Sequence, residues 1–516
     1  MTRDNSCKVI SIYSPSYEEE KPFYSLNLGA CLSDILHKRI LLLDMDTSYE
    51  NILRSLKLEK KISSQEIVIR SGIGLDFLNL GDLGREELGQ LKENYDYILI
   101  NLPLAPQDLT YHIFSMSDSI HIFISSLKKN LEEGYSLLER LLEHKPDCSN
   151  NKLKLVVSRS TTFDALSREE IEWLLRRNVD FFIPELNMME NFIDHDGVPI
   201  TLKQEVSGYS KKLRYIAKFE ADKLVGLALG SGAAFGLAHI GVLKVLEEAE
   251  LPIDMISGSS MGAVIASLWG LGYRSSEIVR FAEQLKSKLN IMRLLDFTIP
   301  ISGILAGNRL KSFLKVFLGE KTFEDLKIPV KIMVYDLANR ETLSIDKGLL
   351  LDAVYKSIAV PGIFKPVIER DRVIIDGGVS EPVPVNVLLG NGVKKIIAVN
   401  VLPDPGDMYR RKIIIERNTQ AEKGLIEKGP FYKKIFFFIR TYFKKIFDPN
   451  IFDVIVTSMQ SMEYMLSKDS CSKASVCLSP IVPDSDSIDF HRVKDFIKEG
   501  EEEARSHLEE IKSLGL

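Results

Sequence analysis

The sequence predicts an α/β protein of two domains, because short apolar strands alternate with helical patterns along two separate stretches of the chain. The 516 residues provide enough length for more than one core, and 45% hydrophobic with 27% charged residues is ordinary globular composition. A polar, helix-like stretch near residues 205–222 separates the two series. We therefore place an N-terminal domain at 1–215 and a C-terminal domain at 216–516.

The N-terminal domain is predicted to be doubly wound. Its strand candidates are short, continuous, β-branched runs of the kind that parallel sheets bury on both faces. These runs span 8–13, 39–43, 97–100, 119–124 and 153–157. Helical patterns fall between them, at 23–38, 132–145 and 167–177. Strand–helix alternation of this kind is typical of a parallel sheet with helices on both faces.

The C-terminal domain repeats the alternation and predicts a second, largely parallel central sheet. Strand candidates lie at 225–230, 327–337, 372–376 and 394–401, and a helical pattern covers 236–250. The last 30 or so residues form a charged amphipathic helical pattern.

Composition excludes several functional classes. A net charge of -6 gives no sign of a nucleic-acid partner. Five scattered cysteines without a CxxC pair predict neither a disulfide framework nor a zinc site, and nothing else calls for a metal or cofactor. The first residues lack a signal-peptide pattern, and no apolar run reaches the ~18 residues of a membrane span. We expect a cytoplasmic protein that meets a membrane only peripherally.

The clearest chemical motif is the pentapeptide GSSMG at 258–262, which follows an apolar strand and precedes a helical run. In that context G-x-S-x-G forms a tight turn that presents the serine hydroxyl at a helix N-terminus. Gly258 and Gly262 would permit the turn, and Ser260 is the candidate nucleophile. A Gly/Ser-rich turn without chemistry is the alternative.

Two further small-residue turns support a catalytic reading. The loop from Gly230 to Gly236 could line an oxyanion hole with the backbone N–H groups of Ser231, Gly232, Ala233 and Ala234. Downstream, Asp376 ends a predicted strand and precedes Gly377 and Gly378, where we expect a special backbone conformation.

Residues 224–402 resemble a patatin-like phospholipase domain of the bacterial type related to neuropathy target esterase. The stretches LGSGAAFGLAHIGVLKVLEE, IDMISGSSMGAV, AVPGIFKPV and VIIDGGVSEPVPV carry the resemblance, in the family's order. It implies a Ser–Asp dyad in which Ser260 attacks an ester and Asp376 is the base. The implied function is hydrolysis of a phospholipid or lysophospholipid through an acyl-serine intermediate.

The glycine-rich loop departs from the family pattern, which is G-x-G-x-x-G with an arginine before the last glycine. Ser231, Ala233 and Phe235 stand at those positions here. A catalytically impaired lipid-binding or scaffold protein is therefore the alternative function. A histidine base is the alternative mechanism, with His491 and His507 as its downstream candidates, whereas His239 is expected to pack or bond a turn.

The N-terminal domain resembles the ParA/MinD-type ATPases, which implies a P-loop-NTPase-like fold. The resemblance rests on KVISIYSP, FYSLNLG, LLLDMD and NYDYILINLP. The segment SYEEEKPF at 16–23, at the position of the phosphate loop, is not suited to bind phosphate. It has acids and a proline where phosphate needs converging N–H groups. Lys21, Asp44 and Asp46 survive by position, whereas Asn101 replaces the expected carboxylate. We expect a pseudo-ATPase that mediates dimerisation or binds a protein partner.

Residues 428–447, KGPFYKKIFFFIRTYFKKIF, combine six cations and eight aromatic rings without one acid. A buried helix with charged edges is one interpretation. The composition is also that of an interfacial helix on anionic lipid, which predicts peripheral attachment to the inner face of the cytoplasmic membrane.

Overall fold

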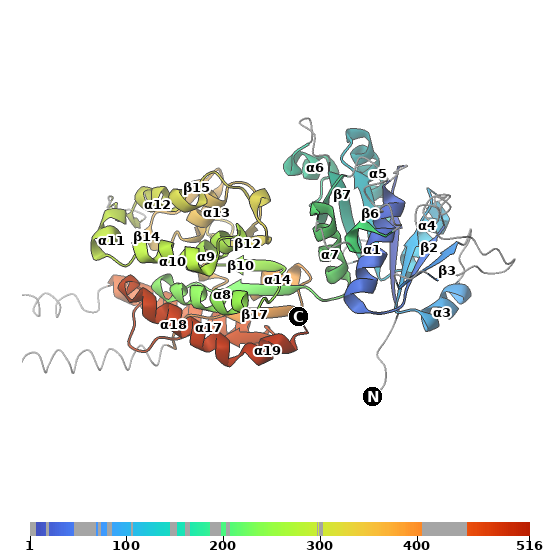
Figure 1. The fold of residues 1–516 in the computed structure, drawn as a ribbon. Coiled ribbons are helices and arrows are strands. Elements are labelled where there is room, and N and C mark those ends of the chain that lie inside the picture. The colour runs from blue at the N-terminus through green and yellow to red at the C-terminus, as the bar shows by residue number, and fades with distance from the viewer. Residues whose placement is uncertain are drawn as a thin grey trace, which may run out of the picture. The chain divides into compact units, whose positions relative to one another are not determined.

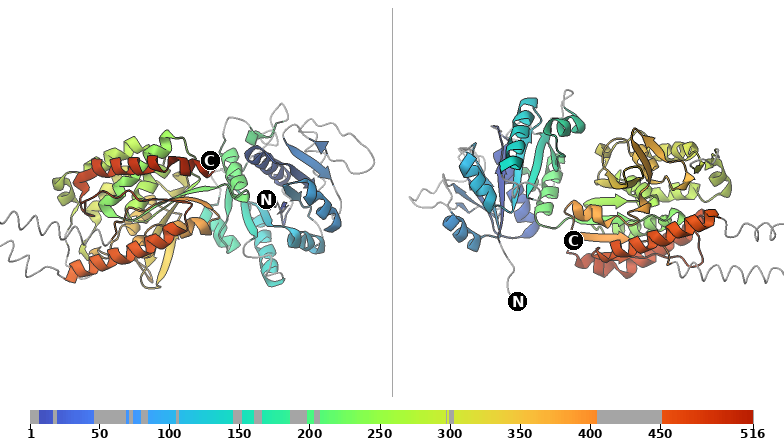
Figure 2. Two further views of the ribbon diagram at one scale, coloured as in Figure 1. Left: turned by 90° about the horizontal axis from the view of Figure 1, so that it is seen from below. Right: turned by 180° about the vertical axis from the view of Figure 1, so that it is seen from behind.

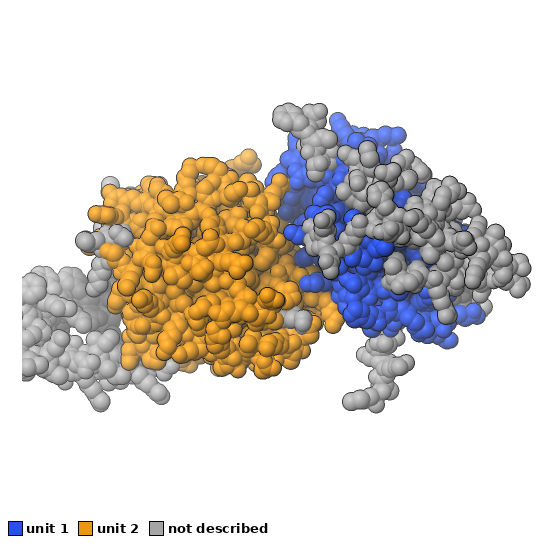
Figure 3. Space-filling view, in the orientation of Figure 1, with its two compact units in different colours: residues 1–221 blue, residues 222–516 orange. Residues whose placement is uncertain are grey.

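The structure is a computed structural model that divides into two compact units, residues 1–221 and 222–516 (Figure 3). Helix α7 (Gly208–Glu220) closes the first unit, whereas the sequence placed the boundary at 215, inside this helix. The segment 428–447 and Asp46 lie outside the described residues. The structure describes residues 7–16, 20–45, 69–70, 74–79, 85–104, 107–144, 152–159, 166–185, 198–202, 207–296, 298, 303–404 and 451–515.

Unit 1 is built on one sheet with the strand order β3-β4-β2-β5-β1-β6-β7-β8 (Figure 1). Apart from the antiparallel pair of β3 with β4, its neighbouring strands run parallel. The strands are β1 (Lys8–Tyr13), β2 (Ile40–Asp44), β3 (Ile69–Arg70), β4 (Leu75–Asn79), β5 (Tyr97–Asn101), β6 (Ser119–Ser125), β7 (Leu153–Arg159) and β8 (Phe181–Pro184).

Helices cover both faces of this sheet. On one face, α1 (Lys21–Leu36) and α7 pack into one apolar cluster. The opposite face carries a second cluster under α3 (Arg85–Asn94), α4 (Gln107–Met116), α5 (Lys128–His144) and α6 (Arg168–Leu175). A short 3-10 turn, η3 (Ile200–Leu202), lies before α7. The predicted doubly wound α/β fold is confirmed.

Unit 2 has a second sheet, in the order β15-β16-β12-β10-β9-β17-β18, with β13 paired to β12. Its centre, from β12 to β18, is parallel, whereas β13, β15 and β16 are antiparallel. The predicted, largely parallel central sheet is therefore confirmed. The strands are β9 (Val225–Leu229), β10 (Met255–Gly258), β12 (Val330–Asp336), β13 (Glu341–Ile345), β15 (Val367–Glu369), β16 (Arg372–Asp376), β17 (Lys395–Val399) and β18 (Val476–Leu478), and β11 (Gly303–Leu305) pairs separately with β14 (Gly362–Phe364).

Helices also flank the second sheet, and Figure 2 shows α17 and α18 on opposite sides of it. Helix α18 packs on α8, while α17 contacts α14, β18 and η6. The helices are α8 (Ala238–Glu248), α9 (Met261–Gly270), α10 (Ser275–Gln284), α11 (Lys288–Leu294), α12 (Asn308–Leu318), α13 (Leu350–Ser357), α14 (Val385–Gly390), α17 (Ile451–Ser472), α18 (Val493–Ser506) and α19 (Leu508–Ser513). Short 3-10 turns are η4 (Ala233–Leu237), η5 (Phe323–Asp325), η6 (Gly377–Val379) and η7 (Phe490–Arg492).

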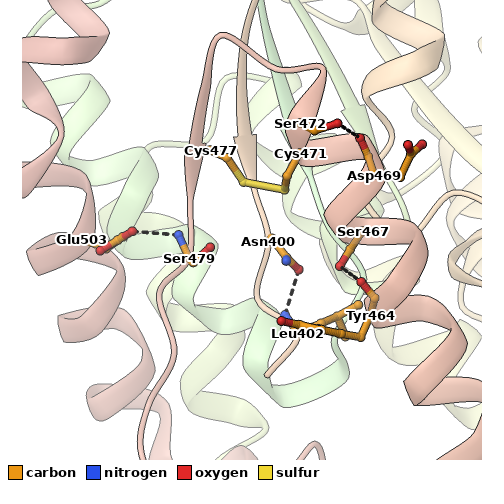
Figure 4. The surroundings of a disulfide bond; sticks show 10 residues. All are labelled: Asn400, Leu402, Tyr464, Ser467, Asp469, Cys471, Ser472, Cys477, Ser479 and Glu503. Carbon is orange, nitrogen blue, oxygen red and sulfur yellow. Dashed lines mark hydrogen bonds between the residues drawn. A yellow bond between two sulfur atoms is a disulfide. The ribbon is translucent and has the colours of Figure 1, made fainter. Parts of the chain in front are cut away.

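One disulfide joins the end of α17 to β18, through Cys471 and Cys477 (Figure 4). The scattered cysteine pattern predicted no disulfide framework. The pairing was not visible from spacing because a tight turn between helix and strand brings the two side chains together, with 5.6 Å between their Cα atoms. Among the described cysteines, Cys7 and Cys31 are free and buried.

Candidate active site

Strand register brings the two candidate catalytic residues to the same level of the second sheet. Gly258 of β10 pairs with Ile332 of β12, and Asp376 of β16 pairs with Val334 on the other side of β12. Ser260 follows the last residue of β10 by two positions, so the serine and the aspartate lie on either side of β12 near its residues 332–334. Two segments more than 100 residues apart thus converge at one sheet edge.

Ser260 occupies a sharp turn between β10 and α9. Its backbone has φ 53° and ψ -120°, and it precedes the first residue of the helix. A positive φ at a residue with a Cβ costs roughly 1–3 kcal/mol and persists only where the surroundings hold it. Two hydrogen bonds hold the preceding residue, Ser259. Its N–H donates to the Leu229 carbonyl (3.2 Å), and its hydroxyl donates to the Glu381 carbonyl (2.5 Å).

The glycines around Ser260 are required by close packing rather than by positive φ. A Cβ on Gly262 would lie 2.1 Å from the Leu229 carbonyl oxygen, and one on Gly258 would lie 2.6 Å from the carbonyl oxygen of Gly262. Both contacts are far inside van der Waals distance, so only glycine lets the turn fold back onto β9.

The Ser260 hydroxyl lies close enough to the Asp376 carboxylate to lower its pKa. Both side chains are nearly buried, with 7% and 4% of their surface exposed. Burial raises the pKa of Asp376 from 3.8 to about 6, while the Ser260 hydroxyl and the bond from the Gly378 N–H (2.6 Å) oppose that shift. The result is a carboxylate that is ionised at neutral pH yet more basic than usual.

The backbone at Asp376 is ordinary, contrary to the special conformation that we expected from DGG. Its φ is -51° and its ψ is 134°. Gly377 is instead required by crowding, because a Cβ there would lie 2.2 Å from the Met333 carbonyl oxygen of β12. The Cβ of Gly378 would meet the Ser231 side chain at 2.9 Å, which places the turn after Asp376 against the glycine-rich loop.

That loop has fewer available donors than predicted. The N–H of Ser231 donates to the Pro382 carbonyl (2.7 Å) and that of Ala234 to the Ser487 carbonyl (2.9 Å), so neither is an oxyanion donor in this arrangement. The N–H groups of Gly232 and Ala233 have no hydrogen-bond acceptor within the described residues. The predicted set of four is thereby reduced to these two.

The other loop positions are used in packing. Ala233 has a φ of 47°, which costs on the order of 1–2 kcal/mol where a glycine would be unstrained. Ser231 has no positive φ, so its substitution causes no such strain. Gly236 lies against the residue after the nucleophile, since a Cβ there would be 2.7 Å from the Met261 Cβ, and Gly230 N–H donates to the Val399 carbonyl (3.0 Å).

The structure gives the histidines other roles. His239 is fully buried, and burial lowers its pKa to about 4, so the ring is neutral. Its Nε2–H therefore donates to the Gly230 carbonyl (2.8 Å), as expected of a turn-bonding residue. His491 lies beside Asp489 (3.7 Å) and His507 beside Glu503 (3.7 Å). Among the described residues, no histidine hydrogen-bonds Ser260 or Asp376.

Three residues near the dyad were not identified from the sequence. Ser357 accepts a hydrogen bond from the Ser260 N–H. Met261 is the first residue of α9 and, within the described part of the chain, its N–H has no acceptor, which makes it a third candidate oxyanion donor. Glu463 of α17 is close enough for its charge to interact with Asp376. Nothing in the local sequence of Ser357 or Glu463 marks either one.

The described residues contain no group of three or more histidine, cysteine or acidic side chains that could hold a metal ion. None of the described helices has the length and apolarity needed to cross a membrane.

In unit 1, the side chains at the positions that resemble a nucleotide site bond to other groups of the protein. Lys21 Nζ donates to the Leu102 carbonyl, and the Glu20 carboxylate accepts from the Ser158 hydroxyl (2.6 Å). The Asn101 amide donates to the Asp44 carboxylate (2.7 Å) at the ends of β5 and β2. Protein groups therefore engage Lys21, Glu20 and Asp44, while residues 17–19 lie outside the described chain.

Comparison with known proteins identifies the site-bearing region. Residues 227–389 match the family of patatin-like phospholipases, so unit 2 contains a patatin-like domain. An uncharacterized NTE family protein of Mycobacterium tuberculosis is 37% identical over 177 residues, which is 34% of this chain and 49% of that protein. The neuropathy target esterase sws of Drosophila melanogaster is 30% identical over 190 residues, 36% of this chain and 13% of that protein. The chain thus spans about half or less of the relatives it matches.

Solved structures similar in fold to unit 1 are MinD cell division proteins and ParA family ATPases. The MinD cell division protein of Aquifex aeolicus has 22% identity and a TM-score of 0.34, covering 41% of this chain and 95% of that chain. A ParA family ATPase from Chlorobium tepidum has 17% identity and a TM-score of 0.32, covering 42% and 98%.

Proposed function

We propose that the protein is a serine lipid acyl hydrolase of the phospholipase or lysophospholipase type, in which Ser260 and Asp376 form a catalytic dyad. The observation that carries this proposal is the Ser260 hydroxyl beside a buried Asp376 carboxylate, whose pKa burial raises to about 6. A general base works best when its pKa lies near the working pH. The match of residues 227–389 to patatin-like phospholipases supports a lipid ester as the substrate class.

The geometry supports a two-step mechanism in which the Ser260 proton leaves with the alcohol and a proton from water replaces it on Ser260. Asp376 accepts the Ser260 proton as Oγ attacks the ester carbonyl carbon. The N–H groups of Gly232, Ala233 and Met261 donate hydrogen bonds to the carbonyl oxygen and stabilise the negative charge that develops on it. The protonated Asp376 then donates to the leaving alcohol as the C–O bond breaks, which leaves an acyl-Ser260. Asp376 next accepts a proton from water, hydroxide attacks the acyl group, and the proton returns to Ser260.

A catalytically impaired scaffold remains the alternative, and the glycine-rich loop is the observation that favours it. Ala233 holds a positive φ at the position where the oxyanion donors must be placed to within a fraction of an ångström. Loss of one such donor costs about 100–1000-fold in rate. Phe235 also supplies a ring, packed 5.9 Å from that of Phe496, where the family pattern has a cation.

A fluorophosphonate probe and a set of soluble and phospholipid esters distinguish the two functions. We expect labelling and turnover by the wild type in detergent or lipid micelles, and loss of both in Ser260→Ala and Asp376→Asn. His491→Ala is the matched control and should retain most of the activity, because a dyad needs no imidazole. A wild type that neither labels nor turns over any ester, or equal turnover by Ser260→Ala, would establish the scaffold alternative.

We further infer that unit 1 is a pseudo-ATPase that serves as a homodimerisation or protein-binding platform. The bonds of Lys21 to Leu102 and of Glu20 to Ser158 support this, because a nucleotide phosphate would have to displace both. We expect no magnesium-dependent ATP binding by calorimetry on the full chain at micromolar concentration. Binding that a Lys21→Ala change removes would instead support an ATP-dependent role.

The proposed cellular location is the cytoplasm, at the inner face of the cytoplasmic membrane, with residues 428–447 as the anchor. Charge and aromatic content support this, since a substrate that resides in a bilayer must be reached at its surface.

A further inference from the structure

The buried N–H of Ser260 depends on a side chain from a distant part of unit 2. The turn at Ser260 removes this N–H from both the sheet ladder and the hydrogen bonds of α9, yet the residue is only 7% exposed. A buried N–H without an acceptor would cost about 1–3 kcal/mol. Its acceptor is the hydroxyl oxygen of Ser357, at 3.0 Å, and that residue lies 97 positions later in the sequence.

Ser357 is held so that only an acceptor position faces Ser260. The side chain is fully buried at the last residue of α13, and its O–H donates to the Met333 carbonyl of β12 (2.7 Å). A serine hydroxyl has one proton, so donation to Met333 leaves its lone pairs for the Ser260 N–H. Ser357 is therefore the donor in its hydrogen bond with Met333 and the acceptor in its hydrogen bond with Ser260.

The same short segment also holds the other member of the dyad. Asp376 N–H donates to the carbonyl of Ala359 (3.0 Å), two residues after Ser357. The Met333 carbonyl that binds Ser357 is also the group against which Gly377 packs. The segment 357–359 therefore bonds the backbone N–H of both Ser260 and Asp376, and its Ser357 hydroxyl also bonds β12, the strand that lies between them.

We propose that Ser357 is a positioning residue that, together with the Ala359 carbonyl, sets the separation and orientation of Ser260 and Asp376. This inference rests on the proposed function and deepens it. Ser357 bonds the backbone of Ser260 and of β12 rather than the reacting atoms, so it acts through the nucleophile. Its hydroxyl stabilises the positive φ that aims Ser260 Oγ at the Asp376 carboxylate, and a misplacement of about 1 Å in such a geometry can cost about 100-fold in rate.

Ser357→Ala tests the proposal, with Ser267→Ala as its matched control. Ser267 is an equally buried serine on α9, but its hydroxyl donates to the Ala263 carbonyl within the helix and does not reach the dyad. Both changes remove one buried hydroxyl, so both should lower the melting temperature to a similar degree. Only Ser357→Ala should lower kcat, by about 10–100-fold with KM nearly unchanged.

The pH profile separates positioning from general destabilisation. The Ser260 hydroxyl lowers the pKa of Asp376, so a variant that displaces this hydroxyl should shift the acid limb of kcat/KM to higher pH. Ser267→Ala should leave that limb in place. Ser357→Cys, which fills the site with a somewhat larger side chain but offers a poor acceptor, gives the same test if the alanine variant does not fold.

The outcomes keep the positioning role and the proposed function apart. Activity in the wild type with an unchanged kcat and acid limb in folded Ser357→Ala and Ser357→Cys would overturn the positioning role and leave the hydrolase standing. Absence of turnover in the wild type, with no labelling of Ser260, would refute both. Equal kinetic losses in Ser357→Ala and Ser267→Ala would reduce Ser357 to a structural residue.

Discussion

At the scale of single residues, Asp376 combines a catalytic advantage with a cost in stability. Its pKa rises from 3.8 to about 6 because burial disfavours the charged form. Between pH values of about 4 and 6 the native protein holds a proton that the unfolded chain has already released. The native state binds more protons there, so stability falls as pH rises through this window and stays lower above it.

Asp376→Asn should therefore stabilise the fold while abolishing turnover. The amide resembles the neutral acid and can still accept from the Gly378 N–H. Above pH 6 the gain should be about 1–3 kcal/mol, since each pKa unit corresponds to about 1.4 kcal/mol. Below pH 4 the variant and the wild type should differ little. Urea unfolding at pH 4 and pH 7.5 measures this, and an equal or lower stability of the variant at pH 7.5 would contradict it.

Glu463 adds a second perturbed carboxyl near the dyad. Burial first, and then the charge of Asp376, raise its pKa to about 8. Glu463 is therefore protonated at neutral pH and gains its charge as pH rises through about 8. A new negative charge beside Asp376 should repel an anionic substrate far more than a neutral one.

We expect KM for an anionic phospholipid to rise several-fold above pH 8 in the wild type, whereas KM for an uncharged ester stays flat. Glu463→Gln should remove this dependence and leave kcat at pH 7 close to that of the wild type. Glu499→Gln on α18 is the control, because it removes an acid from another helix of the same unit. A pH dependence of KM that persists in Glu463→Gln would exclude Glu463 as its source.

At the scale of elements, the turn after β10 shows how closely the site depends on missing side chains. Gly262→Ala would place a Cβ 2.1 Å from the Leu229 carbonyl, a backbone atom of β9 that has little room to move. We expect a loss of about 1–3 kcal/mol in unfolding free energy, together with at least a roughly 10-fold loss in kcat. Thermal melts and turnover on a soluble ester measure both.

Gly390→Ala provides the matched comparison, because a Cβ at the end of α14 meets nothing within 4 Å. This change should be neutral, or stabilising by up to about 1 kcal/mol, with full activity. Comparable losses in the two variants would show that crowding at β9 is not what the turn requires.

The strands that sequence patterns predicted best contain a short apolar, β-branched run that the sheet buries. Residues 8–13 and 372–376 were predicted at their observed bounds: residues 9–13 of β1 are all buried, and Ile374 and Ile375 of β16 are buried. The short antiparallel strands β13 and β15 were missed. Their residues are mostly exposed or half-buried, so neither alternation nor a continuous apolar run marks them.

The residues of the candidate site also differ in how far the sequence could predict them. Ser260 and Asp376 sit in motifs whose spacing carries chemistry, and the geometry joins them. Ser357 and Glu463 carry no local signal, because one acts through a bond across 97 residues and the other lies on a helix that packs beside η6. The oxyanion donors were overcounted for a related reason, since only the fold shows that Pro382 and Ser487 accept from two of the four N–H groups.

At the scale of the whole molecule, the proposed anchor at 428–447 gives a prediction that is independent of the catalytic chemistry. Each cation near an anionic surface contributes about 1 kcal/mol. Replacing Lys433, Lys434, Lys444 and Lys445 by glutamine should weaken binding to anionic vesicles by about 100–1000-fold. The remaining binding should also depend less on salt. Vesicle sedimentation at two ionic strengths measures both effects.

The rings of the same segment should matter even where charge attraction is strong. Replacing Phe436, Phe437 and Phe438 by serine removes apolar surface that would enter the headgroup layer, so vesicle binding should weaken at low salt as well. Turnover on a water-soluble ester should survive both the lysine and the phenylalanine changes, because the anchor is proposed to deliver the enzyme to its substrate and not to form the site. Vesicle binding unchanged in the lysine variant would refute electrostatic anchoring. Loss of folding in the phenylalanine variant, seen as a lower melting temperature together with loss of turnover on the soluble ester, would instead show that the rings are part of a core.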